Sequence, residues 1–179
     1  FPDLIDYDKN VAALKEVQPA PIKASDIAVR IGTSWIDKEI YKEFFCQLID
    51  MPYYMRDGIE LYYNKHDSSW RVDRTTSYAR NYRSMKITNV YGTSRANAYR
   101  LFEDCLNQRF TQIYDTVLDE DGREKRVLNQ SETVAAREKQ NKIKEAFKDW
   151  IFASPGRRDE LEAIYNRLFN QIKLPKYDG

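Results

Sequence analysis

The residues whose types and spacing could do chemistry are arginines that alternate with aromatic rings in residues 61–100. This segment has a net charge of +6, whereas residues 1–60 have −4 and residues 101–179 have −1. The planar guanidinium of arginine can donate two parallel hydrogen bonds to one phosphate. Aromatic rings beside such a row can stack on unpaired bases, which contributes on the order of 1–3 kcal/mol per base. The pattern therefore indicates a surface that contacts nucleic acid.

We predict that six cations in this segment contact phosphates and that three rings stack on bases. The cations are Arg71, Arg74, Arg80, Arg83, Lys86 and Arg95, and the rings are Trp70, Tyr78 and Tyr82. Arg100, Tyr91 and Tyr99 continue the same alternation. The segment matches no motif that identifies nucleic-acid-binding proteins. A second interpretation stays open, in which these arginines form a solvated sheet face and pair with acidic residues of the N-terminal segment.

Residue types that catalysis or metal binding requires do not come together in this sequence. The six glycines are too far apart for a Walker or dinucleotide-binding loop. His66 is the only histidine and lies in a predicted turn, and Cys46 and Cys105 lie in helical patterns. Residues 50–53, Asp-Met-Pro-Tyr, lack the second proline and the polar residue of a base-flipping methyltransferase motif. We therefore predict no catalytic residue, no metal site and no cofactor in this chain.

Short strands are expected to position the basic segment. Alternation of apolar and polar residues predicts strands at 59–63, 70–72 and 85–90, with a polar loop at 73–81. A second hairpin is predicted further along the chain, where residues 111–118 and 125–128 flank Asp119-Glu120-Asp121-Gly122. A helix at 37–50 precedes the strands, and another helix follows Gly92.

The last part of the chain is predicted to be two long helices within 129–174, joined at Ser154-Pro155-Gly156. The second helix has six apolar residues at helical spacing: Leu161, Ile164, Tyr165, Leu168, Phe169 and Ile172. The first helix has a matching stripe made of Ile143, Ala146, Phe147, Trp150 and Ile151. We expect these two faces to bury each other in an antiparallel helical hairpin. Asn129, followed three residues later by Glu132, predicts the start of the first helix.

The predicted class is α+β, with short antiparallel hairpins packed against several helices. A length of 179 residues favours a single domain, 1–179. Within it we distinguish a helical N-terminal part (1–58), a basic strand region (59–91), a helix plus hairpin (92–128) and a helical hairpin (129–174). There is no apolar run long enough for a bilayer, so no membrane partner is expected. The ends of the chain suggest a piece excised from a longer polypeptide.

Several stretches of the sequence resemble, in the same order, parts of very large bacterial mobile-element proteins. Two of them are Tyr91-Gly92-Thr93-Ser94-Arg95 and Ala146-Phe147-Lys148-Asp149-Trp150-Ile151. The full set is residues 14–19, 24–27, 29–36, 91–95, 97–99, 146–151 and 165–179, which covers nearly the whole length. These phage and conjugative-element proteins are similar to an N-6 adenine DNA methyltransferase fused to a Swi/Snf-type, superfamily-two helicase.

In that family the matching stretch lies between the methyltransferase and the helicase motor. The resemblance implies a bacterial, cytoplasmic, non-catalytic domain that binds or positions DNA, with the flanking methyltransferase and helicase domains as further partners. It also implies that the parent protein uses S-adenosylmethionine and ATP with Mg²⁺ outside this stretch. One alternative is a structural linker that docks the two parts through the helical hairpin. Another is an independent small enzyme, which would require a deep pocket with converging titratable groups.

Overall fold

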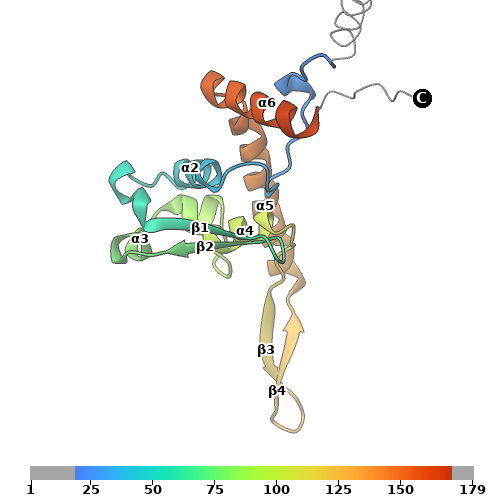
Figure 1. The fold of residues 1–179 in the computed structure, drawn as a ribbon. Helices are drawn as coiled ribbons and strands as arrows, with labels where there is room; N and C mark the ends of the chain where they lie inside the picture. Colours follow the sequence, from blue (N-terminus) through green and yellow to red (C-terminus); the bar gives the residue numbers. More distant parts are fainter. Residues whose placement is uncertain (1–18, 171–179) are drawn as a thin grey trace, which may run out of the picture. The chain divides into compact units, whose positions relative to one another are not determined.

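A computed structural model describes residues 19–170, which form two compact units (Figure 1). The larger unit is Val29–Ile151, and the smaller one combines residues 19–28 with 152–170. Residues 1–18 of the predicted helical N-terminal part and residues 171–174 of the predicted last helix lie outside the described residues. Within residues 19–170, every helix is too short or too polar to cross a membrane.

The larger unit mixes helices with two separate antiparallel hairpins, which confirms the predicted α+β class. Its α-helices are α2 (Lys38–Leu48), α3 (Ser77–Asn81), α4 (Ala98–Leu106) and α5 (Gln130–Ile151). Its strands are β1 (Ile59–Asn64), β2 (Ser69–Arg74), β3 (Tyr114–Leu118) and β4 (Glu124–Leu128). A 3-10 helix, η2 (Tyr53–Gly58), precedes β1, and a π-helical turn, η3 (Lys86–Val90), follows α3.

Aromatic rings from α2, α4 and α5 form the core of the larger unit. Phe45 of α2 stacks on Phe102 of α4 with 4.4 Å between ring centroids. Phe44 of α2 meets Phe147 of α5 edge-on at 5.2 Å, and Phe147 and Ile143 of α5 are at most 1% exposed. Burial of each such side chain contributes roughly 1.5–3 kcal/mol. The stripe of α5 that was predicted to pack on the last helix is therefore covered by α2 and α4.

The β1–β2 hairpin has one face toward the core and one toward solvent. Leu61 of β1 is 2% exposed and pairs with Val72 of β2 in the antiparallel register. Side chains alternate along a strand, so Trp70, Val72 and Arg74 share the core-facing side of β2. Arg71 lies on the opposite side, opposite a solvent-facing residue of β1. The hairpin therefore divides the predicted basic residues between its two faces.

The third predicted strand, residues 85–90, is wrong: this segment is the π-helical turn η3. The N–H of Tyr91 donates to the carbonyl of Lys86 at 2.9 Å, which closes the turn. Ile87 and Val90 are three residues apart, which is the spacing of a helical face rather than of a strand. Ile87 is the buried member of this pair.

Two helix starts differ from the predictions because of side-chain caps. The predicted loop at 73–81 contains α3, whose first turn is capped by Thr76: its hydroxyl oxygen accepts from the N–H of Ala79 at 3.2 Å. Helix α4 begins later than predicted, because the side chain of Asn97 accepts from the N–H of Arg100 at 3.1 Å. This cap places Arg100 in the first turn of α4.

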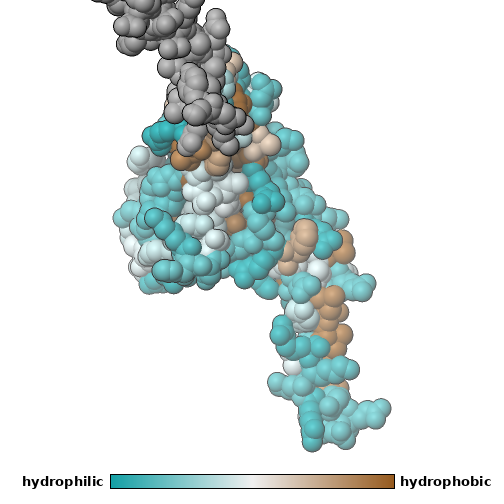
Figure 2. All heavy atoms as spheres, turned by 45° about the vertical axis from the view of Figure 1, so that its right-hand side comes forward, coloured by the Kyte–Doolittle hydropathy of each residue, from teal (hydrophilic) through white to brown (hydrophobic). Residues whose placement is uncertain are grey.

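The β3–β4 arm, defined as residues 114–128, projects from the rest of the larger unit (Figure 1). Every residue of β4 is exposed, and within β3 only Asp115 is partly buried. The predicted turn is present, because the Asp119 carboxylate accepts from the N–H groups of Asp121 and Arg123. Five apolar residues of the arm are more than a third exposed: Tyr114, Val117, Leu118, Val127 and Leu128. Figure 2 shows hydrophobic surface along this arm.

The smaller unit consists of α6 (Pro155–Phe169) and a segment with one 3-10 turn, η1 (Ala24–Asp26). The side-chain amide of Asn166 pairs with the main chain of Ile22, accepting its N–H at 2.8 Å and donating to its carbonyl at 2.9 Å. Of the six apolar residues predicted to share a buried face of this helix, Leu161 alone is fully buried among those that the structure describes.

Candidate functional site

Two of the predicted cations, Arg71 and Lys86, contact the ring of a neighbouring tyrosine. Arg71, on the solvent-facing side of β2, has its guanidinium 4.6 Å from the ring centroid of Tyr62, and its Nε is 3.2 Å from a carboxylate oxygen of Asp73. Lys86 has its ammonium group 5.8 Å from the ring centroid of Tyr91.

The three predicted stacking rings differ in their exposure. Trp70 is 4% exposed, and its indole N–H donates to the carbonyl of Gly32 at 2.9 Å, so its ring is not available to a base, contrary to the prediction. Tyr82 is half-buried and donates to a main-chain carbonyl at 2.6 Å. Tyr78 is 38% exposed, and its hydroxyl donates to both carboxylate oxygens of Asp57, which raises the pKa of Tyr78. Tyr78 is thus the only exposed ring of the three.

Arg80 and Arg83 each donate to the main-chain carbonyl of an arginine that precedes them in the sequence. Arg80 Nη1 donates to the carbonyl of Arg74 at 3.2 Å, and Arg83 Nη1 donates to the carbonyl of Arg80 at 3.0 Å. These bonds fix the guanidinium groups of Arg80 and Arg83 on the main chain that runs from the end of β2 through α3. Their remaining N–H groups can still donate, since a guanidinium carries five.

A hollow of about 350 Å³ brings two further arginines to this group. Arg74, Arg95 and Arg100 all line it. Arg100 Nη2 donates to the carbonyl of Gln112 at 3.2 Å. Glu103 also lines the hollow, but its carboxylate accepts from the N–H of Val72 at 2.9 Å. We call Arg74, Arg80, Arg83, Arg95 and Arg100 the arginine cluster.

The ring of Tyr99 packs against one member of the arginine cluster, Arg74. It is 6% exposed, and the guanidinium of Arg74 lies 4.3 Å from its ring centroid, within the range of a cation–π interaction. Burial raises the pKa of Tyr99 to about 12, and the nearby positive charges of Arg74 and Arg83 act in the opposite direction. Its hydroxyl has no hydrogen-bond partner within the described residues. The buried ring therefore helps to hold the guanidinium of Arg74 in place.

Carboxylates neutralise little of the arginine cluster. Arg95 forms an ion pair with Asp115, with 2.7 Å between Arg95 Nη1 and Asp115 Oδ1. No carboxylate in the part of the chain that the structure describes lies within ion-pair distance of Arg74, Arg80, Arg83 or Arg100. The alternative in which these arginines pair with acidic residues of the N-terminal segment is thus not seen for these four within residues 19–170.

Sequence reasoning left Arg100 and Tyr99 out of the predicted contacts. The local pattern could have included them, because Asn97 is a good N-cap residue and Arg100 is then in the first turn of α4. Their approach to Arg74 depends on the packing of α4 against β2, for which the sequence has no local pattern.

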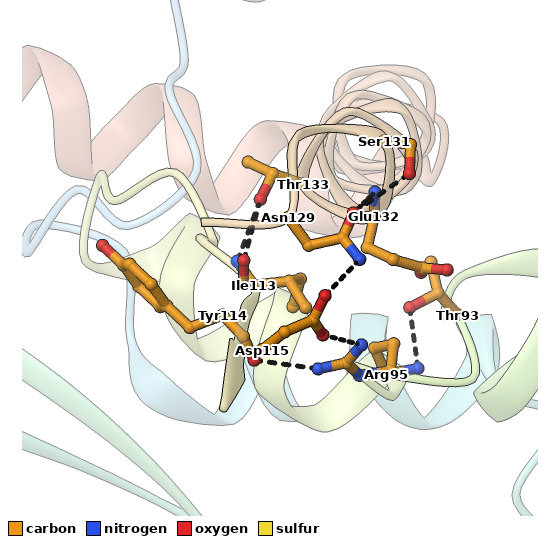
Figure 3. Close-up of polar contacts among 9 residues, drawn as sticks. All are labelled: Thr93, Arg95, Ile113, Tyr114, Asp115, Asn129, Ser131, Glu132 and Thr133. Atoms are coloured by element: carbon orange, nitrogen blue, oxygen red, sulfur yellow. Dashed lines mark hydrogen bonds and ion pairs between the residues drawn. The ribbon is translucent and has the colours of Figure 1, made fainter. Parts of the chain in front are cut away.

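Arg95 also links the arginine cluster to the root of the β3–β4 arm (Figure 3). Its guanidinium donates to the Asp115 carboxylate at 2.7 Å and to the carbonyl of Tyr114 at 2.9 Å. The other carboxylate oxygen of Asp115 accepts from the side chain of Asn129 at 2.9 Å, and Asn129 caps α5 by accepting from the N–H of Glu132. This network joins the arm, the start of α5 and the loop before α4.

The hydrogen bond from Arg95 lowers the pKa of Asp115, and the bond from Asn129 adds to it. Replacing Arg95 by alanine should therefore raise the pKa of Asp115 toward the ordinary value of about 3.9. Because the folded pKa is lowered, the carboxylate stabilises the arm root above the ordinary pKa, and this contribution is lost as the pH falls through the lowered value. NMR titration of the Asp115 carboxyl carbon measures the shift. Replacing Arg126, which contacts the ring of Tyr114 instead, should leave it unchanged.

In residues 19–170 no group of three or more His, Cys, Asp and Glu side chains has an arrangement that could hold a metal ion. Residues 30–171 match the model of a protein family described as a domain of unknown function, DUF8437. No curated protein and no solved structure matches the chain.

Proposed function

The chain belongs to the DUF8437 family, and we propose that it is a non-catalytic domain that binds nucleic acid, DNA above all, through the arginine cluster. The observation that carries the proposal is that Arg74, Arg95 and Arg100 line one hollow, while Arg80 and Arg83 are held on the chain that follows Arg74. Four of these five arginines have no carboxylate partner in the described residues. Clustered positive charges attract phosphate groups, and their mutual repulsion destabilises the folded state. Such a cluster is therefore better explained by binding than by packing.

The geometry favours contacts with the sugar–phosphate backbone over contacts with bases. Arginine forks suit phosphate oxygens, which supply half or more of the hydrogen bonds in protein–DNA complexes. Of the predicted stacking rings only Tyr78 is exposed, and it lies in α3, as Arg80 does. The domain should therefore position a strand or duplex with little preference for sequence.

We further propose that the parent protein is a DNA methylase–helicase, as the sequence resemblance implies, and that this domain presents DNA to the flanking catalytic parts. S-adenosylmethionine and ATP with Mg²⁺ would then bind to those parts. The alternative proposal, a structural linker that docks the methyltransferase against the motor, has less support, because the apolar stripe of α5 is already buried within the larger unit. Co-purification with the flanking domains tests that alternative.

Binding to labelled single-stranded DNA, duplex DNA and RNA of equal length, measured by fluorescence anisotropy over a salt series, tests the main proposal. We expect affinity to fall steeply with salt. The double variant Arg80→Ala/Arg83→Ala should flatten the dependence of log K on log salt by about 0.9 per lost contact with duplex DNA.

The matched control is Arg123→Ala/Arg126→Ala, which removes the same charge from the arm. This control should change the slope much less. Equal effects of the two double variants, or binding that does not depend on salt, would contradict the proposed role of the arginine cluster.

A further inference from the structure

The outer edge of β3 is unpaired beyond Tyr114, whose carbonyl accepts from Arg95, and the hairpin register decides which main-chain groups face outward. The N–H of Asn129 donates to the carbonyl of Ile113, and the N–H of Asp119 donates to the carbonyl of Arg123, so these residues face the partner strand. Because hydrogen-bonding direction alternates along a strand, Tyr114, Thr116 and Leu118 direct their N–H and C=O groups outward. The outward groups of Thr116 and Leu118 have no partner in the described residues.

An isolated two-stranded hairpin with exposed apolar side chains is marginally stable in water, and its open edge is a template for another strand. Leu118 is 70% exposed, and the valines that face each other obliquely on the arm, Val117 and Val127, are each 41% exposed. The fold within the larger unit leaves these side chains uncovered. An additional pair of strands would cover both the edge and part of this apolar surface.

A two-fold axis through Thr116 would bring the three outward residues of β3 opposite those of a second copy. The carbonyl of Tyr114 would then accept from the new strand as well as from Arg95, since a carbonyl oxygen has two lone pairs. Thr116 would lie opposite Thr116 of the other copy, and Tyr114 opposite Leu118. Thr–Thr and aromatic–aliphatic cross-strand pairs are favourable. The equivalent register on the other edge, β4, would place Arg126 opposite Arg126, which is a like-charge pair and unfavourable. The residues of β3 thus favour self-pairing and those of β4 oppose it.

The charges of the arm are complementary in the same register. The free acids of the turn are Glu120 and Asp121, since the carboxylate of Asp119 is used by the turn itself. With the axis at Thr116, Glu120 of one copy comes opposite Gln112 of the other. The carbonyl of Gln112 accepts from Arg100, and Arg95 lies next to it on the carbonyl of Tyr114. Each acidic tip would therefore end beside Arg100 of the other copy, which has no carboxylate partner in the described residues, and near Arg95, which is already paired with Asp115. Both arginines belong to the arginine cluster, so the dimer would use part of it.

We propose that the chain self-associates as a two-fold dimer in which the β3 edges of two arms pair antiparallel about Thr116, forming a four-stranded sheet. This inference does not rest on the proposed contact with nucleic acid. The interface is isologous, as most homodimer interfaces are. The interface is confined to one strand of each arm, so we expect a reversible association that depends on concentration.

A cysteine cross-link tests the register directly. Opposed residues of an antiparallel pair have Cα atoms about 4.5–5.5 Å apart, which lies within the range for a disulfide of about 4.4–6.8 Å. Thr116→Cys should therefore give a covalent dimer under mild oxidation. Arg126→Cys is the matched control, because Arg126 lies opposite Thr116 in the hairpin and faces the other edge. The native thiols do not interfere: Cys46 and Cys105 are fully buried, and burial raises their pKa values to about 11 and about 12.

We expect the Thr116→Cys chain to cross-link more than about tenfold faster than the Arg126→Cys chain, because pairing raises the effective concentration of the two thiols. Sedimentation equilibrium of the unmodified chain should show a monomer–dimer equilibrium. Equal cross-linking of the two variants, or a monomer at every concentration, would overturn the proposal.

Charge exchange gives a second test that does not depend on a cysteine. Glu120→Arg and Arg100→Glu should each weaken the dimer, and the double variant should restore it, because the opposite charges are then exchanged across the interface. Both positions are exposed, so neither change disturbs the core. The contradicting outcome is that each single variant weakens the dimer and the double variant does not restore it. The tips would then not meet the root arginines, and the proposed register would be wrong.

Discussion

Replacing Gly32 by alanine should destabilise the larger unit by more than about 4 kcal/mol, or leave it unfolded. Gly32 has a φ of +97°, a conformation that costs other residues about 1–2 kcal/mol. A Cβ atom at this position would also lie 2.1 Å from the carbonyl oxygen of Leu106 and 2.8 Å from the side-chain nitrogen of Gln108. The first of these is a main-chain atom at the end of α4, which cannot rotate away.

The surroundings of Gly32 leave little freedom for a compensating shift. Its N–H donates to the hydroxyl of Tyr41 at 3.0 Å, and its carbonyl accepts from the indole of Trp70 at 2.9 Å. The side chain of Gln108 donates to the carbonyl of the preceding residue, Ile31. Movement of the 31–32 segment away from α4 would therefore break contacts with α2, with β2 and with the end of α4 together.

Urea unfolding followed by tryptophan fluorescence measures this effect in the larger unit, because all three tryptophans, Trp35, Trp70 and Trp150, lie within residues 29–151. Gly122→Ala is the control: its φ is +75°, but nothing lies within 4 Å of the added Cβ, so only the conformational cost of about 1–2 kcal/mol applies. If the free energy of unfolding of Gly32→Ala were within about 1 kcal/mol of that of the unmodified chain, the close approach to Leu106 would not hold in solution.

The sequence was most informative where local chemistry decides the structure. The turn at 119–122 and the start of α5 at Asn129 were predictable because their capping bonds join residues two to four positions apart. The α+β class followed from the same kind of pattern. Strand alternation could also have separated Arg71 from Arg74, since residues an odd number apart on β2 face opposite sides.

What could not be predicted depends on contacts between distant segments. The stripe on α5 has the right spacing for any apolar partner, and only the packed unit shows that Phe44 of α2 meets Phe147. Trp70 has the same sequence surroundings as an exposed stacking ring, yet its indole is fixed by Gly32, thirty-eight residues away. The convergence of Arg95 and Arg100 on Arg74 likewise depends on where α4 packs.

Gln140 shows how a polar residue in a charged helix can be buried for a structural reason. It is 0% exposed in the middle of α5, where its neighbours in sequence are lysine, asparagine and glutamate. Its side-chain oxygen accepts from the N–H of Thr111 at 3.1 Å, and its side-chain nitrogen donates to the carbonyl of Arg109 at 2.9 Å. These two bonds satisfy the main chain of the segment that leads from α4 to the β3–β4 arm.

Gln140→Leu should destabilise the larger unit by about 1–3 kcal/mol, mainly because it leaves the N–H of the buried Thr111 without a partner. The carbonyl of Arg109 also loses a bond, but this residue is exposed and water can replace that bond. The same unfolding experiment measures it. Asn141→Leu removes an amide from the next residue of the helix, which is exposed, and should change the free energy of unfolding by less than about 0.5 kcal/mol. A similar small effect of Gln140→Leu would mean that water or another group replaces both bonds.

If the stability fell as expected, the amide protons of the arm root should also exchange faster, since residues 109–111 fix the point from which β3 extends.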